Sequence, residues 1–330
     1  MITPSDISVV VQGPIVRAAQ DPISDFLTRD VLASVRQHLP GAELILSTWQ
    51  GQPVEGLDCD DCVLSDDPGA IPLDPASPAR INNVNRQLVS TRQGLARARR
   101  PYAMKLRTDC PLTGAGFLGI SRDTPRLPGC AMFRERVLVP GCGTVHPAQV
   151  PTIYAVSDLW QFGTKPDLTE LWNAPAAPEP ETSRAFTAEA PPPLVYNPVE
   201  GASVRCSPEQ HYVISWLKAR GIPAEVRYLA HCPWGHTALS LLAIANNFTV
   251  CEEAELGVRL PARIVRNLMT PPAETCRRWE RTSRRLSGHL SSFLFLPLEL
   301  ASVRAKWWHF WVRYHLKPRL RGASAMACSS

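Results

Sequence analysis

The segment 82–109 constrains the fold more than any other part of the chain. Four of its residues follow the i, i+4, i+7, i+11 spacing of one helix face: Val84, Leu88, Thr91 and Leu95. Tyr102, Met104 and Leu106 then alternate with other residues, which predicts a strand that ends near Asp109. The segment therefore predicts an amphipathic helix that leads into a buried strand.

The rest of the N-terminal part also alternates between predicted strands and a predicted helix. Apolar and β-branched runs predict strands at 7–11, 42–48 and 62–65, and a helix is expected from a Ser24 cap to about Leu39. Such alternation predicts βαβ units, whose strands run parallel. We therefore expect an α/β fold with a mostly parallel, twisted sheet flanked by helices. Its ligand site is expected beyond the carboxyl ends of the strands.

Several motifs resemble a known protein family. In chain order they are ISVVVQGP (7–14), LPGAELILSTW (39–49), DDPG (66–69), NNVNRQLVST (82–91), YAMKLRTD (102–109), SDLWQFG (157–163) and PEQHY (208–212). Their sequence and order are similar to the WavE lipopolysaccharide-synthesis family over about residues 7–220. The resemblance implies a GT-A-like glycosyltransferase that moves a sugar from a nucleotide-sugar donor to a bacterial surface glycan, lipopolysaccharide core or capsule.

Polar residues at the predicted strand ends and helix start are the candidate contacts to a nucleotide-sugar donor. A helix start offers free N–H groups to a phosphate, glycine lets the backbone approach a ligand, and Lys or Arg neutralises a diphosphate. The residues in this group are Gln12, Gly13, Asp67, Asn85, Arg86, Lys105 and Arg107. Asp67 also belongs to an Asp-Pro-Gly sequence that is typical of a turn.

Asp109 is the candidate ligand for a divalent cation, Mn²⁺ or Mg²⁺, that would bridge the donor diphosphate. GT-A enzymes commonly carry two carboxylates in a DxD motif, whereas this chain has Arg-Thr-Asp at 107–109. Lys105 or Arg107 is therefore an alternative source of positive charge. We expect Asp109 and Arg86 to converge on one pyrophosphate pocket.

Asp158 and Glu209 are the candidate general bases that would deprotonate the acceptor hydroxyl. A strand is predicted at 153–156, which places Asp158 at the boundary of an element, where it can equally cap a short helix. Glu209 follows a Ser207 cap and Pro208 at the start of a predicted helix. A carboxylate at that position also suits the helix dipole without any chemistry.

Two other classes of function compete with glycosyl transfer. A nucleotidyltransferase shares the α/β topology and the diphosphate chemistry, but a Gly-rich loop with Arg or Lys is expected after its first strand. Here only Gln12-Gly13-Pro14 follows the first strand. A membrane-docked glycan-binding protein without catalysis is the second alternative, and binding of a nucleoside diphosphate would argue against it.

Residues 259–330 are strongly basic and are predicted to form a helical tail, distinct from a transferase domain at 1–258. They hold 14 Lys/Arg and 3 Asp/Glu, a net charge of +11, which leaves −6 for the rest of the chain. In a helix over 298–317, aromatic and apolar residues lie opposite a basic stripe, as in interfacial membrane helices. The alternative is that this apolar face packs on the transferase domain. We favour contact with an anionic membrane surface, strengthened by the arginines at 277–285.

Three further features of the sequence concern a loop, the cysteines and the location of the protein. The Pro-rich residues 174–206 are predicted to form a long loop, and Cys59 and Cys62, the single CxxC pair, are predicted to be free thiols in a loop. The start lacks the pattern of a signal peptide, and no run of about 18 apolar residues occurs. We therefore expect a cytoplasmic enzyme, peripheral on the inner membrane, with no nucleic-acid partner.

Overall fold

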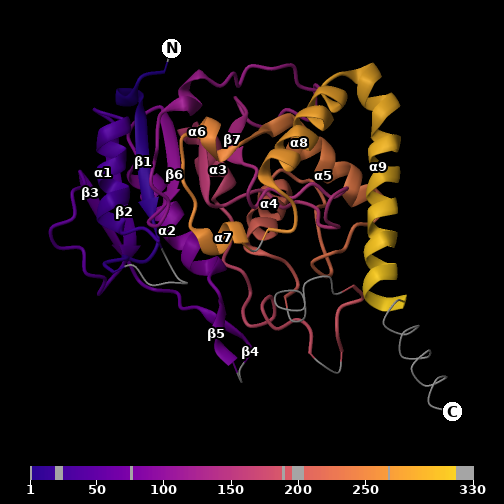
Figure 1. Cartoon of the computed structure of the whole chain (residues 1–330), viewed down its shortest axis with the longest axis horizontal. Helices are drawn as coiled ribbons and strands as arrows, with labels where there is room; N and C mark the ends of the chain where they lie inside the picture. The colour runs from indigo at the N-terminus through magenta and orange to yellow at the C-terminus, as the bar shows by residue number, and fades with distance from the viewer. Residues whose placement is uncertain are drawn as a thin grey trace.

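A seven-stranded sheet forms the centre of the protein, shown in Figure 1 as a computed structural model that describes residues 2–18, 25–74, 77–187, 190–194, 204–266 and 268–316. In their order across the sheet, the strands are β3 (Asp61–Ser65), β2 (Glu43–Trp49), β1 (Ile7–Gln12), β6 (Tyr102–Arg107), β8 (Trp160–Thr164), β7 (Val137–Pro140) and β9 (Phe248–Cys251). Neighbouring strands are parallel except around β8, which is antiparallel to both β6 and β7. The predicted α/β fold with a mostly parallel sheet is confirmed.

Helices cover both faces of this sheet. On one face lie α1 (Thr28–His38), α6 (Glu253–Leu256) and the 3₁₀ helix η2 (Gly116–Gly119). On the other face lie α2 (Val84–Arg97), α3 (Lys165–Leu171), α4 (Pro208–Ala219) and α5 (Trp234–Asn247). Strand β1, which follows the 3₁₀ helix η1 (Pro4–Asp6), contributes Val9 and Val11 to the first layer and Val10 to the second. This alternation is the period of two that a strand buried on both faces requires.

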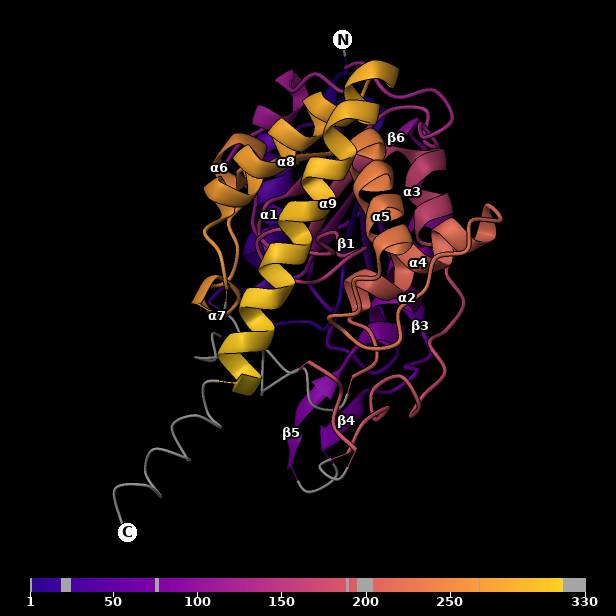
Figure 2. The same cartoon turned by 90° about the vertical axis from the view of Figure 1, so that its right-hand side faces the viewer.

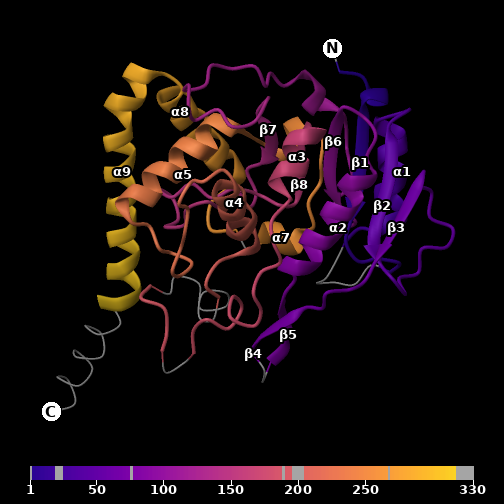
Figure 3. The same ribbon diagram turned by 180° about the vertical axis from the view of Figure 1, so that it is seen from behind.

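A separate antiparallel hairpin, β4 (Ile71–Asp74) and β5 (Ser77–Asn82), leads directly into α2. Figures 1 and 3 show this hairpin projecting from the end of the sheet at which β1 and β6 terminate. This hairpin was not predicted from the sequence. Its position places the polar start of α2 next to those strand ends.

Helix α2 lies close to the sheet because residue 94 is glycine. A Cβ atom on Gly94 would come within 2.3 Å of Val10 Cγ1 and 3.1 Å of Ser47 Cβ, so a larger residue fits only if the helix moves. The apolar helix face predicted from the sequence is buried, with Val84 and Leu95 at most 3% exposed. The packing of this face fixes the N-terminal turn of α2 relative to the sheet.

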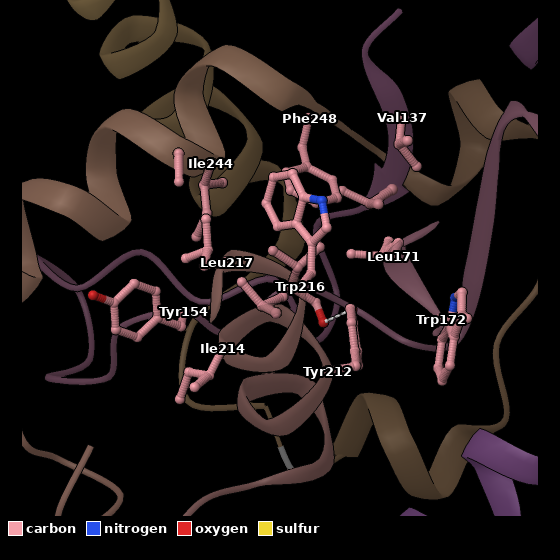
Figure 4. Close-up of a cluster of buried hydrophobic side chains, with 14 of the residues drawn as sticks. Val137, Tyr154, Leu171, Trp172, Tyr212, Ile214, Trp216, Leu217, Ile244 and Phe248 are labelled. Atoms are coloured by element: carbon pink, nitrogen blue, oxygen red, sulfur yellow. Dashed lines mark hydrogen bonds between the residues drawn. The ribbon is translucent and has the colours of Figure 1, made fainter. Parts of the chain in front are cut away.

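Large aromatic side chains fill the core between the sheet and α4 (Figure 4). Trp216 is 1% exposed, stacks on Phe133 with 4.4 Å between ring centroids, and meets Phe248 edge-on at 6.0 Å. Trp172 stacks on Tyr212 at 4.6 Å. Aromatic pairs at such distances stabilise a fold beyond the area that they bury. This cluster therefore fixes α4 on the sheet.

Some predicted boundaries differ from those in the structure. Residues 153–156 form no strand but a buried irregular segment, and the strand begins only at Trp160. The apolar run at 153–156 reflects burial, which periodicity alone does not distinguish from strand pairing. Helix α1 begins at Thr28, and the predicted cap Ser24 lies outside the described residues. The described residues between 174 and 206 contain no helix or strand, in agreement with the predicted loop.

Residues after 258 continue the body of the fold. Three helices and a π turn follow: α7 (Ala262–Arg266), α8 (Pro272–Leu286), α9 (His289–Trp311) and Val312–Leu316. Leu260 joins the core on one side of the sheet, and Trp279 and Leu286 join the core on the other side. In the described part of the chain, residues on both sides of the predicted boundary at 258 therefore belong to the same two hydrophobic cores. Within these same residues, no helix combines the length and apolar character needed to cross a membrane.

We expect Trp216→Ala to lower the free energy of unfolding by about 3–5 kcal/mol, because it removes a large aromatic side chain from the core and leaves a cavity. Trp234→Ala is the matched control, since Trp234 is 59% exposed. Its effect should stay within about 0.5 kcal/mol. Urea unfolding of the two variants measures both values. Equal destabilisation would contradict the assignment of Trp216 to the core that fixes α4.

Candidate functional site

The ends of β1 and β6 are joined by a tight contact that requires glycine. Gly13 has a φ of +129°, and a Cβ atom on it would lie 2.9 Å from Thr108 Oγ1. Thr108 Oγ1 donates a hydrogen bond of 2.7 Å to the Pro14 carbonyl, and the Thr108 N–H donates to the Gln12 carbonyl at 3.1 Å. The contact holds in place the strand end that carries Arg107.

Two arginines hold the carboxylate of Asp109, which lies just beyond β6. Arg107 donates two hydrogen bonds of 2.8 Å to it, and Arg263 of α7 donates one of 2.6 Å. The Asp109 side chain is only 5% exposed. Burial would raise the pKa of Asp109, but the charges and hydrogen bonds of Arg107 and Arg263 outweigh burial and hold this pKa well below its ordinary value. The carboxylate is therefore ionised, and the cluster has one more positive than negative charge.

A cavity of about 480 Å³ opens beyond these strand ends. Its walls come from the β4–β5 hairpin, α2, α4, α7 and the segment that precedes β8. Its polar and charged lining residues are Asn82, Asn83, Gln87, Arg107, Asp158, Ser207, Glu209 and Arg263. A space of this size suits a small organic ligand, and it lies where open α/β sheets bind ligands.

Asp158 lines this cavity at the end of the buried irregular segment 153–159. Its side chain makes no hydrogen bond to any residue that the structure describes, although it is only 3% exposed. The backbone beside it is fixed, because the Ser157 N–H donates to Thr144 Oγ1 at 3.0 Å and Gln161 Nε2 donates to the Ser157 carbonyl at 2.8 Å. The segment thus presents an unpaired carboxylate to the cavity from a rigid backbone.

The same segment contains a residue in a strained conformation. Tyr154 has a φ of +60°, a left-handed value that no other described non-glycine residue adopts. Its N–H donates to Ser240 Oγ at 2.8 Å, and Gln210 Nε2 of α4 donates to the neighbouring Ile153 carbonyl at 2.9 Å. Strained residues of this kind cost about 1–3 kcal/mol and cluster at functional sites. Helices α4 and α5 therefore hold the segment that carries Asp158 in a costly conformation.

Lys105 lies inside the core and not in the cavity. It is fully buried, its Nζ lies 5.0 Å from the centre of the Trp172 ring, and this Nζ has no hydrogen-bond partner among the described residues. Burial lowers the pKa of Lys105 to about 8, against the attraction of the Asp158 carboxylate, which raises it. Lys105 therefore interacts electrostatically with Asp158 but does not line the cavity.

The structure does not bring Asp109 and Arg86 together, although the sequence predicted that they converge. Arg86 donates two hydrogen bonds, of 2.7 and 2.5 Å, to Asp67 in the loop after β3, whereas Asp109 binds Arg107 and Arg263. Neither Arg86 nor Asp109 is among the residues that line the cavity. Their neighbours Gln87 and Arg107 line it instead.

Four other candidate donor contacts, Asp67 among them, also lie outside the cavity lining. Asn85 exchanges hydrogen bonds of 2.8 and 3.2 Å with the backbone of Ala177, so it fixes the Pro-rich segment on α2. Gln12 is 2% exposed and accepts a hydrogen bond of 2.7 Å from Ser90. Gly13 allows the ends of β1 and β6 to pack closely together. Of the residues proposed from the sequence, the cavity brings together Arg107, Asp158 and Glu209.

Sequence reasoning missed several lining residues. Asn83 and Gln87 are four residues apart and so share a face of α2, and this spacing was the available signal. The sequence did indicate the polar cluster at 82–87, but Asn85 and Arg86 were predicted as the donor contacts instead of Asn83 and Gln87. Arg263 carried no signal, because it lies within the basic residues that were assigned as a tail.

The residues around Asp109 do not form a ready site for a divalent cation. A hard cation needs several oxygen ligands, whereas the Asp109 carboxylate is already bound by two guanidinium groups. Within the described residues, no group of three or more His, Cys, Asp or Glu side chains is arranged to hold a metal ion. Two guanidinium groups around one carboxylate are better suited to bind an anion than a cation.

An α/β sheet with two arginines beyond its strand ends has the charge and position that suit an anionic, phosphate-bearing ligand. The sequence profile of the family described as WavE lipopolysaccharide synthesis matches residues 7–299. The chain therefore belongs to the WavE lipopolysaccharide synthesis family, and the match extends beyond the motifs at 7–220. No protein of curated function matches the chain in a sequence search.

We expect the wild-type protein to gain stability relative to Lys105→Met as the pH rises from about 7 to about 9. The pKa of Lys105 is about 8 in the fold and 10.5 in its ordinary state, so the unfolded chain binds more protons between these values. The free energy of unfolding of the wild type therefore rises with pH in this window. Urea unfolding of both proteins at the two pH values measures the difference. A constant difference would show that burial does not shift this pKa.

Proposed function

We propose that this protein is a glycosyltransferase that moves a sugar from a nucleotide-sugar donor to a glycan acceptor in lipopolysaccharide synthesis. One observation carries the proposal: the arginines Arg107 and Arg263 and the unpaired carboxylate of Asp158 line the same cavity. Sugar transfer needs both a positive group for the departing diphosphate and a base for the acceptor hydroxyl. Membership of the family and the mostly parallel sheet support a GT-A-like transferase.

Arg107 and Arg263 are the proposed diphosphate-binding residues. Asp109 orients both side chains but uses only part of their donors, because each guanidinium carries five N–H groups. The remaining N–H groups can donate to the oxygen atoms of a diphosphate. The cluster has an excess positive charge, which stabilises the negative charge that develops on the leaving group as the glycosidic C–O bond breaks.

Asp158 is the proposed general base. In a direct displacement, the acceptor oxygen forms a bond to the anomeric carbon, its proton passes to the Asp158 carboxylate, and the diphosphate leaves with the bonding electron pair. The carboxylate must be ionised and free of hydrogen bonds to accept this proton. Buried Lys105, whose charge interacts with the Asp158 carboxylate, is a proposed positioning residue. Glu209, also at the cavity, is the second candidate base.

We expect Asp158→Asn to lower kcat for sugar transfer by about 10²–10⁴-fold while donor affinity stays nearly constant, because the amide cannot accept the proton. Glu209→Gln is the matched control, since both acids line the cavity. Release of nucleoside diphosphate from a panel of nucleotide-sugars gives kcat, and calorimetry gives the donor affinity. A large loss of kcat in Glu209→Gln alone would transfer the role of base to Glu209. Activity unchanged in both variants would contradict the proposed chemistry.

We expect Arg263→Gln to weaken the binding of a nucleoside diphosphate by about tenfold or more, because a charged hydrogen bond contributes about 1.5–3 kcal/mol. Arg266→Gln is the control, since Arg266 lies on the same short helix but does not line the cavity. Calorimetry with free nucleoside diphosphates measures both affinities. Equal losses in the two variants would indicate a general effect of charge and not a contact at the cavity.

We expect the affinity for a nucleoside diphosphate to persist in the presence of a chelator. The arginine cluster supplies positive charge at the site, and the Asp109 carboxylate is already bound by it. Calorimetry with EDTA, and then with added Mn²⁺, measures the contribution of the cation. Binding that appears only with Mn²⁺ would support the metal site first predicted from the sequence.

A further inference from the structure

The outer face of α9 is apolar, and no other described helix or strand covers it. Half of the ten large exposed hydrophobic side chains in the described residues lie on it: Leu290 (74% exposed), Phe293 (79%), Leu294 (54%), Leu298 (60%) and Trp308 (50%). The spacing of these residues places them on one side of the helix. Figure 2, in which α9 faces the viewer, shows no other helix or strand in front of it. We call these five residues the outer row.

The orientation of α9 is fixed by the opposite face. Glu299 is 1% exposed and accepts hydrogen bonds of 2.6 Å from Arg278 and 2.9 Å from Arg285, both on α8. Leu300 and Val303 beside it are buried in the body of the protein. Because breaking a buried ion pair is strongly destabilising, α9 does not rotate freely and the outer row stays outside.

This arrangement corrects the prediction for the tail. The apolar face of the helix predicted over 298–317, which includes Leu300, Val303 and Phe310, was expected to contact the membrane, but these three residues are at most 5% exposed and pack inward. The alternative that this face packs on the transferase domain is what the structure shows. Two of the upstream arginines, Arg278 and Arg285, neutralise Glu299 rather than face outward. The exposed apolar surface is the other side of the helix.

The two helices α8 and α9 carry a net positive charge. Residues 277–316 contain eight Lys/Arg and two Asp/Glu, and one of the two acids is the buried Glu299. Arg277, Arg281 and Arg304 are exposed. An apolar row with basic neighbours complements a surface whose headgroups are anionic and whose interior is hydrocarbon.

We propose that α9 docks on an anionic phospholipid bilayer, with its axis along the membrane surface and the outer row inserted at the boundary between headgroups and acyl chains. The exposed arginines then lie at the phosphate level. The C-terminal end of α9 is linked to the candidate site, because Leu229 lines the cavity and also belongs to the cluster that contains Phe310. A lipid-linked acceptor would be presented at the membrane on which the protein is docked. Only this last step rests on the proposed function.

Vesicle sedimentation tests the docking without any donor or activity. The full-length protein is mixed with vesicles of equal parts phosphatidylglycerol and phosphatidylcholine, or of phosphatidylcholine alone, and the bound fraction is measured. We expect strong binding to the anionic vesicles, weaker binding to the neutral ones, and release from the anionic vesicles as salt is added. No binding of the wild type to the anionic vesicles would overturn the proposal.

Paired variants locate the contact. Phe293→Ser and Leu294→Ser should each lower the vesicle partition coefficient by about tenfold, because each removes apolar area from the inserted row. Leu64→Ser on β3 is the control: Leu64 is 45% exposed on another part of the molecule, and its loss should leave binding unchanged. Arg277→Ser and Arg281→Ser should each lower binding to the anionic vesicles by about fivefold. They keep the apolar row intact, so they test the proposal even if a serine in the row perturbs α9.

Two results would count against docking on lipid. Equal binding by Phe293→Ser, Leu294→Ser and the wild type would place the lipid contact elsewhere. Sedimentation-velocity analysis without vesicles gives the second result. A concentration-dependent dimer that Phe293→Ser abolishes would show that a second copy of the chain covers the outer row. A monomer that binds anionic vesicles through the outer row supports the inference.

Discussion

The contact between Asp109 and its two arginines is the interaction on which the site depends. Arg107 ends the central strand β6, whereas Arg263 lies 154 residues after Asp109, on a short helix near the end of the fold. One buried carboxylate thus joins the parallel half of the sheet to the C-terminal helices. Both arginines also line the cavity. The interaction that stabilises this part of the fold therefore leaves positive charge at the cavity.

Helix α4 connects the hydrophobic core with the chemistry of the site. Trp216 and Tyr212 anchor it in the aromatic cluster, and Gln210 holds the backbone next to the strained Tyr154. The first residues of α4 line the cavity. Because the core fixes this helix, the segment that ends in Asp158 is held in one conformation, and a carboxylate can remain unpaired without collapsing onto a neighbour. The packing of the core thus offsets the strain at Tyr154 and keeps Asp158 at the cavity.

Periodicity identified the N-terminal strands, α2 and the capped start of α4, because each shows a clear spacing or a cap residue. The sequence also indicated the polar cluster at the start of α2 and two acids that reach the cavity. It could not show which side of α2 faces the site, since that depends on the close packing at Gly94. Arg263 was missed, and the inward packing of α9 was kept only as the alternative, for a related reason. Both depend on buried carboxylates, Asp109 and Glu299, whose partners lie far away in the sequence or on another helix.

Gly94 is buried between α2 and the sheet, on a helix whose first turns contribute Asn83 and Gln87 to the cavity. A methyl group at this position would lift α2 away from β1, and the two polar side chains would move with the rigid helix. The width of the cavity is therefore set partly by a contact that no ligand reaches. Related proteins can consequently diverge in the width of this cavity through changes in helix packing, with every residue that lines it unchanged.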